Sequence, residues 1–400
     1  MKKTPCISYL INRRYADYRH GTGVQLGLIA HELGDNALHI CWDSGHALQE
    51  TYVPVLNLNT SLLRRWPFRK GKGLVARTES ALGISWNSED ALARRIRRLR
   101  RARKSASTTE QRQHAYVIVA SEDEAKIARL ILDNLDADYV LNVIDFTHCD
   151  RAVPDSYPQF SALIKGARKV FALTPTIAEV LESMSGEANV CLVGNGRKRP
   201  TGRASAPSSA DPLQIIMIGS LAYERGMQEL KRFCDGLDTG HIQHEVNYIG
   251  PQQMLEHFPA SLAVKYRGAL SDEERDAVLR TMHLAYLPGP DGDPTTDNFA
   301  HYSFPSRLTD YFWHGIPILG PLYESSATAR MLESLSGNGV WFSGESEALV
   351  NAASRLGADT DAWRQSSQTV FEFARKHFDL EVTAEAIASA FVETGSANAE

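Results

Sequence analysis

Residues 301–320 read HYSFPSRLTDYFWHGIPILG, and this stretch decides how the second half of the chain is organised. Pro305 and Ser306 predict the start of an amphipathic helix, and Gly315 with Pro317 predicts its end. The apolar residues ILG that follow predict a short buried strand. A helix that leads directly into a buried strand is typical of a parallel α/β sheet.

The first turn of this predicted helix is also a candidate nucleotide site. Free backbone N–H groups and the positive end of the helix dipole can hold a phosphate there. Arg307 would add a fixed positive charge, and Asp310 would accept hydrogen bonds from ribose hydroxyls. A helix start of the kind that Ser306 gives is also common for purely structural reasons, so the spacing alone leaves both interpretations open.

Length and composition set the broad class of the protein. The chain has 400 residues, which favours two domains, or three at most. Apolar residues make up 43% and charged residues 23%, as is ordinary for a soluble globular protein. The five cysteines are scattered without CxxC spacing, which argues against a disulfide framework or a zinc site and favours a reducing cytoplasm. No apolar run approaches eighteen residues, so we expect neither a membrane-spanning helix nor a signal peptide.

Strand-like and helix-like segments alternate along both halves of the chain, which predicts two parallel sheets covered by helices on both faces. The predicted strands of the first half are ISYLI (7–11), ALHICWD (37–43), AYVIVAS (115–121), DYVLNVID (138–145), KVFALT (169–174) and ANVCLVGNG (188–196). Those of the second half are LQIIMIG (213–219), HEVNYIG (244–250), VKYRG (264–268), LAYLPG (284–289) and ILG (318–320). The polar stretch KRPTGRASAPSSAD between the halves predicts an exposed linker.

We therefore predict an N-terminal Rossmann-like domain over residues 1–197, with a basic insertion at 62–108. The linker 198–211, with a hinge near residue 200, leads to a C-terminal domain over 212–375. Residues 376–400 form a helix and tail that pack back across this hinge. In open α/β sheets, ligands bind beyond the carboxyl ends of the strands. The functional residues are accordingly expected in strand-to-helix loops that face the crevice between the domains.

Four segments together resemble the GT-B glycosyltransferases, and more loosely their large retaining family 4. These segments are VFALTPTIAEVL followed by ANVCLVGNG, then GSLAYERG (219–226), VKYRGALSDEERDAVLRTMHLAYLPG (264–289) and FPSRLTDYFWHGIPILG (304–320). The resemblance spans essentially the whole chain. It implies an α/β fold with two Rossmann-like doubly wound domains facing a cleft, and a C-terminal helix that crosses back. It also implies a nucleotide diphosphate sugar, UDP- or GDP-linked, as donor.

The resemblance assigns the donor to the C-terminal domain. The implied donor-binding residues are Gly219, Ser220, Arg225, Tyr302, Ser306, Arg307 and Asp310. The chain departs from the family at several of them. The two glutamates of the family fall on Tyr302 and Asp310, the arginine of its GR pair falls on Ser220, and its lysine falls on Arg225. These departures leave inversion and retention of the sugar's configuration both open.

Two further loops supply candidates for catalysis. The segment DYVLNVIDFTH, followed by a helix and then by KVFALTPTIAEVL and NVCLVGNG, resembles the membrane-associated glucuronosyltransferases of xanthan assembly, whose proposed catalytic base matches Asp145. An inverting reaction needs such a general base near the acceptor hydroxyl, and His148 lies in the same predicted loop. The alternative for Asp145 is a turn cap. Gly21, Thr22 and Gly23 form a candidate phosphate or acceptor loop, or a plain turn.

We expect neither a metal ion nor a cofactor. The strand ends carry no DxD pair of the kind that metal-dependent transferases use. Asp291-Gly-Asp293 is the nearest match, and we interpret it as a flexible donor loop with turn chemistry. Positive charge for the diphosphate would then come from arginines.

Residues 64–104 carry fourteen Lys or Arg against three acids, a local charge of +11 in a chain whose net charge is −5. Such a segment, interleaved with aromatic residues, suits an anionic membrane surface. The predicted membrane patch consists of Arg64, Arg65, Trp66, Arg94, Arg97, Arg98 and Arg101. The alternative is a solvated arginine-rich helix. A nucleic-acid partner is not expected, because no aromatic stacking platform or known nucleic-acid module is recognisable.

The sequence thus favours a cytoplasmic glycosyltransferase of the hexosyltransferase type, peripheral at the inner membrane and acting in polysaccharide biosynthesis. It would move a sugar from a nucleotide sugar to a lipid-linked or polysaccharide acceptor. Two alternatives stay open: a nucleotide-sugar 2-epimerase of the same fold, and a non-catalytic GT-B scaffold.

Overall fold

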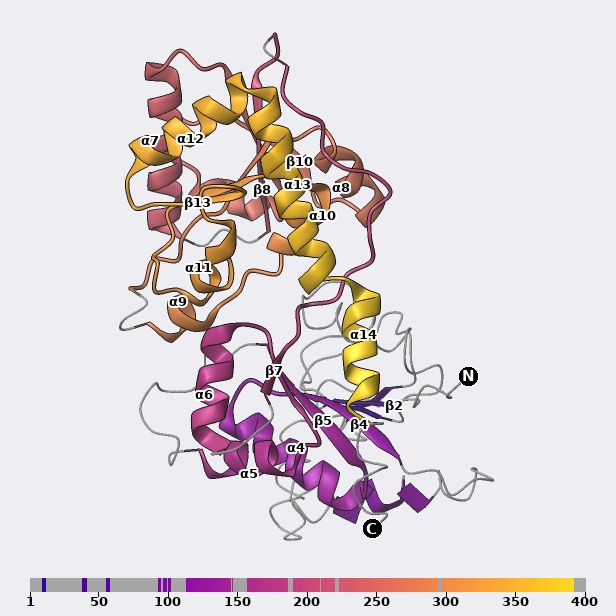
Figure 1. Ribbon diagram of the computed structural model, residues 1–400. Helices are drawn as coiled ribbons and strands as arrows, with labels where there is room; N and C mark the ends of the chain where they lie inside the picture. The colour runs from indigo at the N-terminus through magenta and orange to yellow at the C-terminus, as the bar shows by residue number, and fades with distance from the viewer. Residues whose placement is uncertain are drawn as a thin grey trace, which may run out of the picture.

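The computed structural model describes residues 9–11, 38–41, 55–57, 93–94, 96–98, 100–101, 113–144, 146, 157–185, 190–208, 210–219, 223–293 and 297–391. These residues form two lobes, each built on a parallel sheet (Figure 1). Among them, no helix is both long and apolar enough to cross a bilayer.

The sheet of the N-terminal lobe has seven parallel strands in the order β3-β2-β1-β4-β5-β6-β7. Their bounds are β1 Tyr9–Ile11, β2 Leu38–Cys41, β3 Val55–Asn57, β4 His114–Ile118, β5 Asp138–Val143, β6 Val170–Ala172 and β7 Val190–Leu192. The helices α4 (Glu122–Leu135), α5 (Pro158–Gly166) and α6 (Pro175–Ser185) connect the later strands. The strand order reverses direction beside β1, as in a Rossmann-type sheet.

Helix α4 shows how local sequence sets these elements. The Ser121 hydroxyl accepts a hydrogen bond from the Glu124 N–H and begins the helix, while Asp136 ends it in the left-handed region. Apolar residues at helical spacing, among them Ile131 and Leu135, lie in the buried core of the lobe. Burial of each such side chain contributes about 1.5–3 kcal/mol, so this stripe fixes the helix to the sheet.

The sheet of the C-terminal lobe has six parallel strands in the order β10-β9-β8-β11-β12-β13. The strands are β8 Leu213–Ile218, β9 His244–Ile249, β10 Val264–Gly268, β11 Leu284–Tyr286, β12 Ile318–Gly320 and β13 Val340–Phe342. The α-helices are α7 Glu224–Thr239, α8 Asp272–Leu279, α9 Asn298–Tyr302, α10 Leu308–His314, α11 Ala327–Met331 and α12 Ser346–Ala358. Two 3₁₀ helices, η3 (Gln252–His257) and η4 (Glu333–Leu335), lie in the connections.

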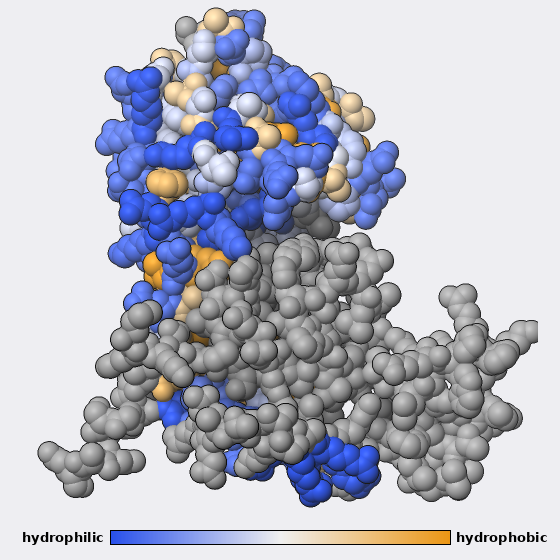
Figure 2. Space-filling model, turned by 90° about the vertical axis from the view of Figure 1, so that its right-hand side faces the viewer, coloured by the Kyte–Doolittle hydropathy of each residue, from blue (hydrophilic) through white to orange (hydrophobic). Residues whose placement is uncertain are grey.

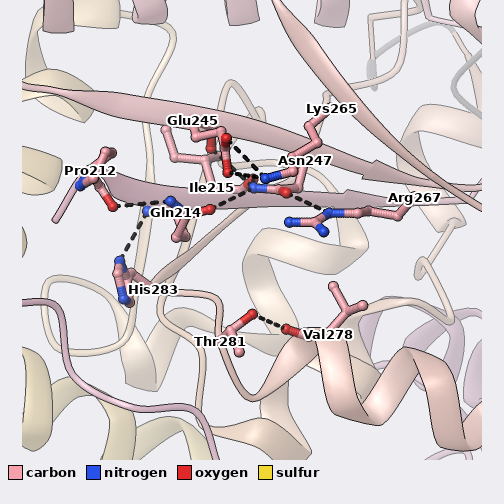
Figure 3. A network of polar contacts seen from close by, with 10 residues as sticks. All are labelled: Pro212, Gln214, Ile215, Glu245, Asn247, Lys265, Arg267, Val278, Thr281 and His283. Carbon is pink, nitrogen blue, oxygen red and sulfur yellow. Dashed lines mark hydrogen bonds and ion pairs between the residues drawn. The ribbon is translucent and has the colours of Figure 1, made fainter.

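A buried polar network joins the first strands of this sheet (Figure 3). The Asn247 side chain is fully buried on β9; its amide donates to Gln214 Oε1 at 3.1 Å and accepts from Arg267 Nε at 2.8 Å. The Gln214 N–H donates to His283 Nδ1 at 3.0 Å. Burial lowers the pKa of His283, which fits a neutral imidazole that accepts this bond. The network satisfies groups that would otherwise be costly to bury.

The last two helices connect the lobes. Helix α13 (Thr360–His377) packs along α10 and α12 of the C-terminal lobe, whereas α14 (Leu380–Ser389) lies on the N-terminal sheet. Ile387 of α14 shares a core with Tyr116 and Phe171 of that sheet. The chain therefore returns across the hinge, and the structure confirms the predicted architecture of two doubly wound lobes with a crossing C-terminal helix.

A second contact joins the lobes on the side of α6 and α11, which lie side by side (Figure 1). Arg330 of α11 donates to Glu179 Oε2 at 2.8 Å and to the Thr176 hydroxyl at 3.2 Å, both on α6. The Arg330 guanidinium lowers the pKa of the Glu179 carboxyl by hydrogen bonding to it. The two lobes thus touch at the hinge and also at this ion pair.

The helix predicted to run from Pro305 and Ser306 to Gly315 is shorter than expected. It begins at Leu308 rather than at Pro305 and Ser306, because the Leu308 N–H bonds to the Pro305 carbonyl in a turn. Gly315 ends it at a φ of 65°, a conformation that favours glycine, and strand β12 follows as predicted.

The face of the C-terminal lobe that Figure 2 shows is mainly hydrophilic, with apolar residues dispersed among polar ones. Within the described ranges, the exposed large apolar residues are Leu192, Tyr266 and Val382. The apolar residues of this lobe are thus concentrated in its core.

Candidate functional site

The candidate site begins where β8 ends. Gly219 follows the strand with a φ of 97°, a left-handed conformation that a side chain would strain. Its N–H donates to the Ile249 carbonyl at 2.9 Å, and its own carbonyl accepts from the Tyr248 hydroxyl at 2.8 Å. The turn is therefore held rigidly at the carboxyl end of the sheet, where open α/β folds bind their ligands.

Arg307 lies directly against this turn. A Cβ placed on Gly219 would meet the Arg307 guanidinium carbon at 3.5 Å. Burial raises the pKa of Tyr248 to about 12, and the positive charge of Arg307 opposes that rise. A cation thus lies against a glycine turn at the strand end, and the missing side chain at residue 219 lets the guanidinium approach the backbone.

Helix α10, which Arg307 caps, is anchored to the end of β8. The Tyr311 hydroxyl is fully buried and accepts a hydrogen bond from the Ile218 N–H at 2.9 Å. Burial raises the Tyr311 pKa well above its ordinary value, so the phenol stays protonated. This bond sets the position of α10 relative to the glycine turn one residue further on.

A second cation, Arg225, lies in the first turn of α7. Its guanidinium stacks over the Tyr323 ring, with 4.3 Å between the guanidinium carbon and the ring centroid, and donates to the Tyr323 hydroxyl. The Asp291 carboxylate accepts from the backbone N–H groups of Glu224 at 3.2 Å and Arg225 at 2.8 Å. Asp291 therefore caps α7, and Tyr323 orients Arg225.

Asp310 lies on α10 with its side chain almost fully buried. Its Oδ1 forms an ion pair with Arg197, and Arg275 Nε of α8 lies 3.7 Å from the same oxygen. Burial alone would lower the pKa of Arg275, but the carboxylates of Asp310 and Asp272 raise it more. The predicted role of Asp310 toward ribose stays a prediction, and the structure adds a role inside the protein.

Tyr302 and Ser306 have structural partners. The Tyr302 ring, at the end of α9, packs edge-on against Phe146 of the N-terminal lobe with centroids 5.5 Å apart. The Ser306 carbonyl accepts from the Thr309 hydroxyl at 2.7 Å. Their predicted contacts with the donor stay predictions.

Other predicted site residues lie outside the described residues. They are Gly21, Thr22, Gly23, Asp145, His148 and Ser220, together with Arg64, Arg65 and Trp66 of the predicted membrane patch. The rest of that patch is described. Arg94, Arg97, Arg98 and Arg101 are exposed, while Ala93 and Ile96 on the same helical segment are buried. Arg100 of this segment pairs with Asp136 at the end of α4.

Sequence reasoning did not identify Arg197, Arg275 or Tyr323 as site residues. Tyr323 follows β12 in a strand-to-helix loop, so the rule that ligands lie at strand ends offered a signal for it. Among the residues that the structure describes, Arg197 and Arg275 contact the site through Asp310. Such long-range pairs leave no local pattern in the sequence.

A cavity of about 540 Å³ lies apart from these residues, between the linker residues 203–207 and α13. Its two arginines are satisfied within the protein: Arg203 bonds to Gln368 and Ser367, and Arg364 to Asp361. No residue from the strand-end turns lines it. It is therefore distinct from the candidate site.

No protein-family model matches the sequence, and no curated protein matches it. Solved structures of glycosyltransferases are similar in fold over nearly the whole chain. HepE of Anabaena, in complex with UDP and glucose, is 14% identical with a TM-score of 0.61, covering 97% of this chain and 100% of HepE. A glycosyltransferase of Rickettsia africae is 10% identical with a TM-score of 0.61 over 98% of this chain and 100% of its own. The galactosyltransferase WaaB of the lipopolysaccharide outer core is 11% identical with a TM-score of 0.60 over 97% and 99%. These similarities establish the GT-B fold.

Proposed function

We propose that this chain is a glycosyltransferase that uses a nucleotide diphosphate sugar, UDP- or GDP-linked, as its donor. The observation that carries the proposal is the Arg307 guanidinium against the Gly219 turn, at the carboxyl end of the C-terminal sheet. A diphosphate fits this combination, because it needs both positive charge and close approach of the backbone. The structure of HepE, which has the same fold, contains UDP-glucose.

The chemistry requires stabilisation of the leaving group. The acceptor hydroxyl oxygen forms a bond to the anomeric carbon while the bond from that carbon to the diphosphate oxygen breaks. The diphosphate leaves with additional negative charge, which Arg307 and Arg225 would stabilise by charge-assisted hydrogen bonds. We propose that these two arginines supply the charge, so that neither a metal ion nor another cofactor is required.

The hydroxyl proton needs an acceptor, and we propose Asp145, with His148 in the same loop binding the acceptor sugar or assisting it. Phe146 follows Asp145 in sequence and packs on Tyr302 of α9. The chain next to Asp145 therefore lies against the donor lobe. This contact supports a base that faces the donor from across the crevice.

We propose a lipid-linked acceptor at the cytoplasmic face of the inner membrane, in polysaccharide biosynthesis. Support comes from the four exposed arginines between residues 94 and 101, whose helical segment buries its apolar side. Each cation near anionic headgroups contributes about 1 kcal/mol to membrane binding. In a GT-B protein the N-terminal lobe lies on the acceptor side, so this surface would bring the site to a lipid-borne sugar.

Thermal unfolding with UDP, GDP and dTDP tests the donor proposal directly. One of these nucleotides should raise the melting temperature of the wild type, because a ligand that binds only the folded state stabilises it. Arg307→Ala should abolish the shift, whereas Arg364→Ala, an exposed arginine on α13, should keep it. Stabilisation by none of the three nucleotides, or an equal shift in the Arg307→Ala variant, would refute the donor proposal.

Transfer of radiolabelled sugar from the nucleotide sugar that binds to a lipid extract tests the reaction. The Asp145→Asn variant should bind the nucleotide as the wild type does and transfer no label. Transfer at the wild-type rate by this variant would exclude Asp145 as the base.

A further inference from the structure

The chain crosses between the lobes twice, and the two crossings are bonded to each other. The outward crossing runs from β7 through Arg197, and the return crossing lies between α13 and α14. The Arg197 N–H donates to the Phe378 carbonyl at 2.9 Å, and the Leu380 N–H donates to the Arg197 carbonyl at 3.2 Å. Arg197 is thus fixed by its backbone at the hinge, where the two crossings meet.

Glycines make this close contact possible. A Cβ on Gly194 would lie 1.8 Å from the His377 carbonyl oxygen, and a Cβ on Gly196 would lie 2.9 Å from the Thr383 Cβ. Side chains at these two positions would not fit without a shift of their neighbours. The two crossings therefore pack tightly against each other and together form the hinge, so that a movement of one crossing is transmitted to the other.

The Arg197 side chain extends from this hinge to α10. Its guanidinium pairs with Asp310 Oδ1, and the carboxylate is only 7% exposed while the guanidinium side chain is 23% exposed. A buried carboxylate is strongly destabilised when its cation is removed, so Asp310 is expected to follow Arg197. Arg275 of α8 lies farther away, at 3.7 Å from the same oxygen, and cannot replace this contact by direct hydrogen bonding.

Asp310 in turn is connected to Arg307 through the backbone. The Asp310 N–H donates to the Arg307 carbonyl at 3.1 Å, so the two residues belong to the same tight turn. The Arg307 guanidinium lies against Gly219, 3.5 Å from the position that a Cβ on this glycine would take. A continuous series of contacts therefore runs from the hinge to the cation at the candidate donor site.

We propose that Arg197 is a positioning residue, which holds α10 through Asp310 and thereby sets the place of Arg307 according to the position of the hinge. This inference rests on the proposed function, because it takes the diphosphate of the donor as the ligand of Arg307. Arg197 itself touches neither donor nor acceptor. Its loss weakens nucleotide binding by misplacing Arg307.

The test is a double-mutant cycle on nucleotide affinity. UDP, GDP and dTDP are titrated calorimetrically into the wild type, and the one that binds is then used with Arg197→Gln, Asp310→Asn and the double variant. We expect Arg197→Gln to raise the dissociation constant about tenfold, and to have almost no further effect in the Asp310→Asn background. In turnover assays the same variant should raise KM for the nucleotide sugar, with a smaller change in kcat.

The matched control is Arg199→Gln. Arg199 lies two residues further along the hinge and pairs with Asp379, which is also buried. It reaches α10 only as a cation 5.9 Å from the Trp313 ring centroid, at the end of the helix remote from Arg307. A loss of this pair should lower stability as much as the loss of the Arg197 pair, yet leave the nucleotide dissociation constant within twofold of the wild type.

The outcomes separate the two proposals. If no nucleotide binds the wild type, the proposed function fails and this inference fails with it. If the wild type binds but Arg197→Gln matches Arg199→Gln in affinity, or acts additively with Asp310→Asn, the inference alone is wrong. Should Arg197→Gln not fold, Arg197→Lys takes its place: it keeps the charge with a single donor group, and an unchanged dissociation constant in that variant also overturns the inference.

Discussion

Gly194→Ala is the sharpest test of the hinge, because one methyl group would contact the backbone of the other crossing. The new Cβ would lie 1.8 Å from the His377 carbonyl oxygen and 2.6 Å from Phe378 Cδ1. Non-bonded atoms pack at about 3.5 Å, so the return crossing would have to move by more than about 1 Å. The φ of Gly194 is outside the left-handed region, and the effect is therefore one of contact rather than of backbone strain.

The cost can be estimated from what the displacement would disturb. Phe378 is fully buried, and its ring stacks on Phe304 and Phe312 with centroids 5.6 Å apart in each pair. Overpacking lowers the free energy of unfolding by about 1–3 kcal/mol. Because the displaced Phe378 ring would also leave gaps beside it, we expect a loss at the upper end of this range, about 3 kcal/mol. Reduced freedom of the unfolded chain returns only about 0.4–1 kcal/mol.

The assay is urea unfolding followed by tryptophan fluorescence, with Gly344→Ala as the matched control. Gly344 has no atom within 4 Å of its potential Cβ, so this variant should stay within about 0.5 kcal/mol of the wild type. If the free energy of unfolding of Gly194→Ala lies within about 1 kcal/mol of that of the control, the two crossings are not packed against each other as described.

Three further predictions concern pH, membranes and the second cation. Burial lowers the pKa of His314 below its ordinary value, so between pH 7.5 and 5.5 the unfolded chain takes up a proton that the folded chain resists. This residue should therefore lower the free energy of unfolding by at most about 1.4 kcal/mol for each pH unit of acidification. The urea midpoint of His314→Gln should fall less steeply with pH than that of the wild type, and equal slopes for the two proteins would contradict the prediction. For the membrane patch, glutamine replaces Arg94, Arg97, Arg98 and Arg101 together. The affinity for anionic vesicles, measured by sedimentation, should fall about a thousandfold, at about 1 kcal/mol per cation. The control, Arg232→Gln with Arg364→Gln on the other lobe, should change this affinity little. Equal binding by all three proteins would assign the arginines another role. Finally, Tyr323→Ala should raise the dissociation constant of the bound nucleotide several-fold by releasing Arg225, whereas Tyr323→Phe should keep most of the affinity because the ring persists; equal effects in calorimetry would exclude the stacking.

Regular features of the sequence predicted most strands of the two sheets, though not β3 and β13, and the physical cause of these features is local. Apolar runs such as LQIIMIG are buried on both faces of a parallel sheet, so composition alone marks them as strands. Gly315 marked a helix end because few other residues adopt its left-handed conformation. The start of α10 was less well determined, since Pro305 and Ser306 suit a turn as well as a first helical turn.

The partners of the site residues could not be predicted in the same way. Arg197 and Asp310 are more than a hundred positions apart, and nothing near either residue indicates the other. Tyr302 falls where the resembling family carries a glutamate, yet its ring packs on Phe146 from the opposite lobe. Both contacts form only when the two lobes are in place, so they depend on tertiary structure and not on local pattern.

The ribose contact predicted for Asp310 from the sequence is compatible with the ion pairs that Asp310 forms in the structure. Helix position suggested a carboxylate for the ribose, and the structure pairs this carboxylate with the hinge. Both guanidinium contacts, from Arg197 and from Arg275, are made to Oδ1. A carboxylate has two oxygens and about four acceptor positions, so a contact with ribose through Oδ2 would not displace Arg197. If both hold, the carboxylate that binds the donor nucleoside is the one that Arg197 positions from the hinge, and a single side chain then joins the hinge to the donor.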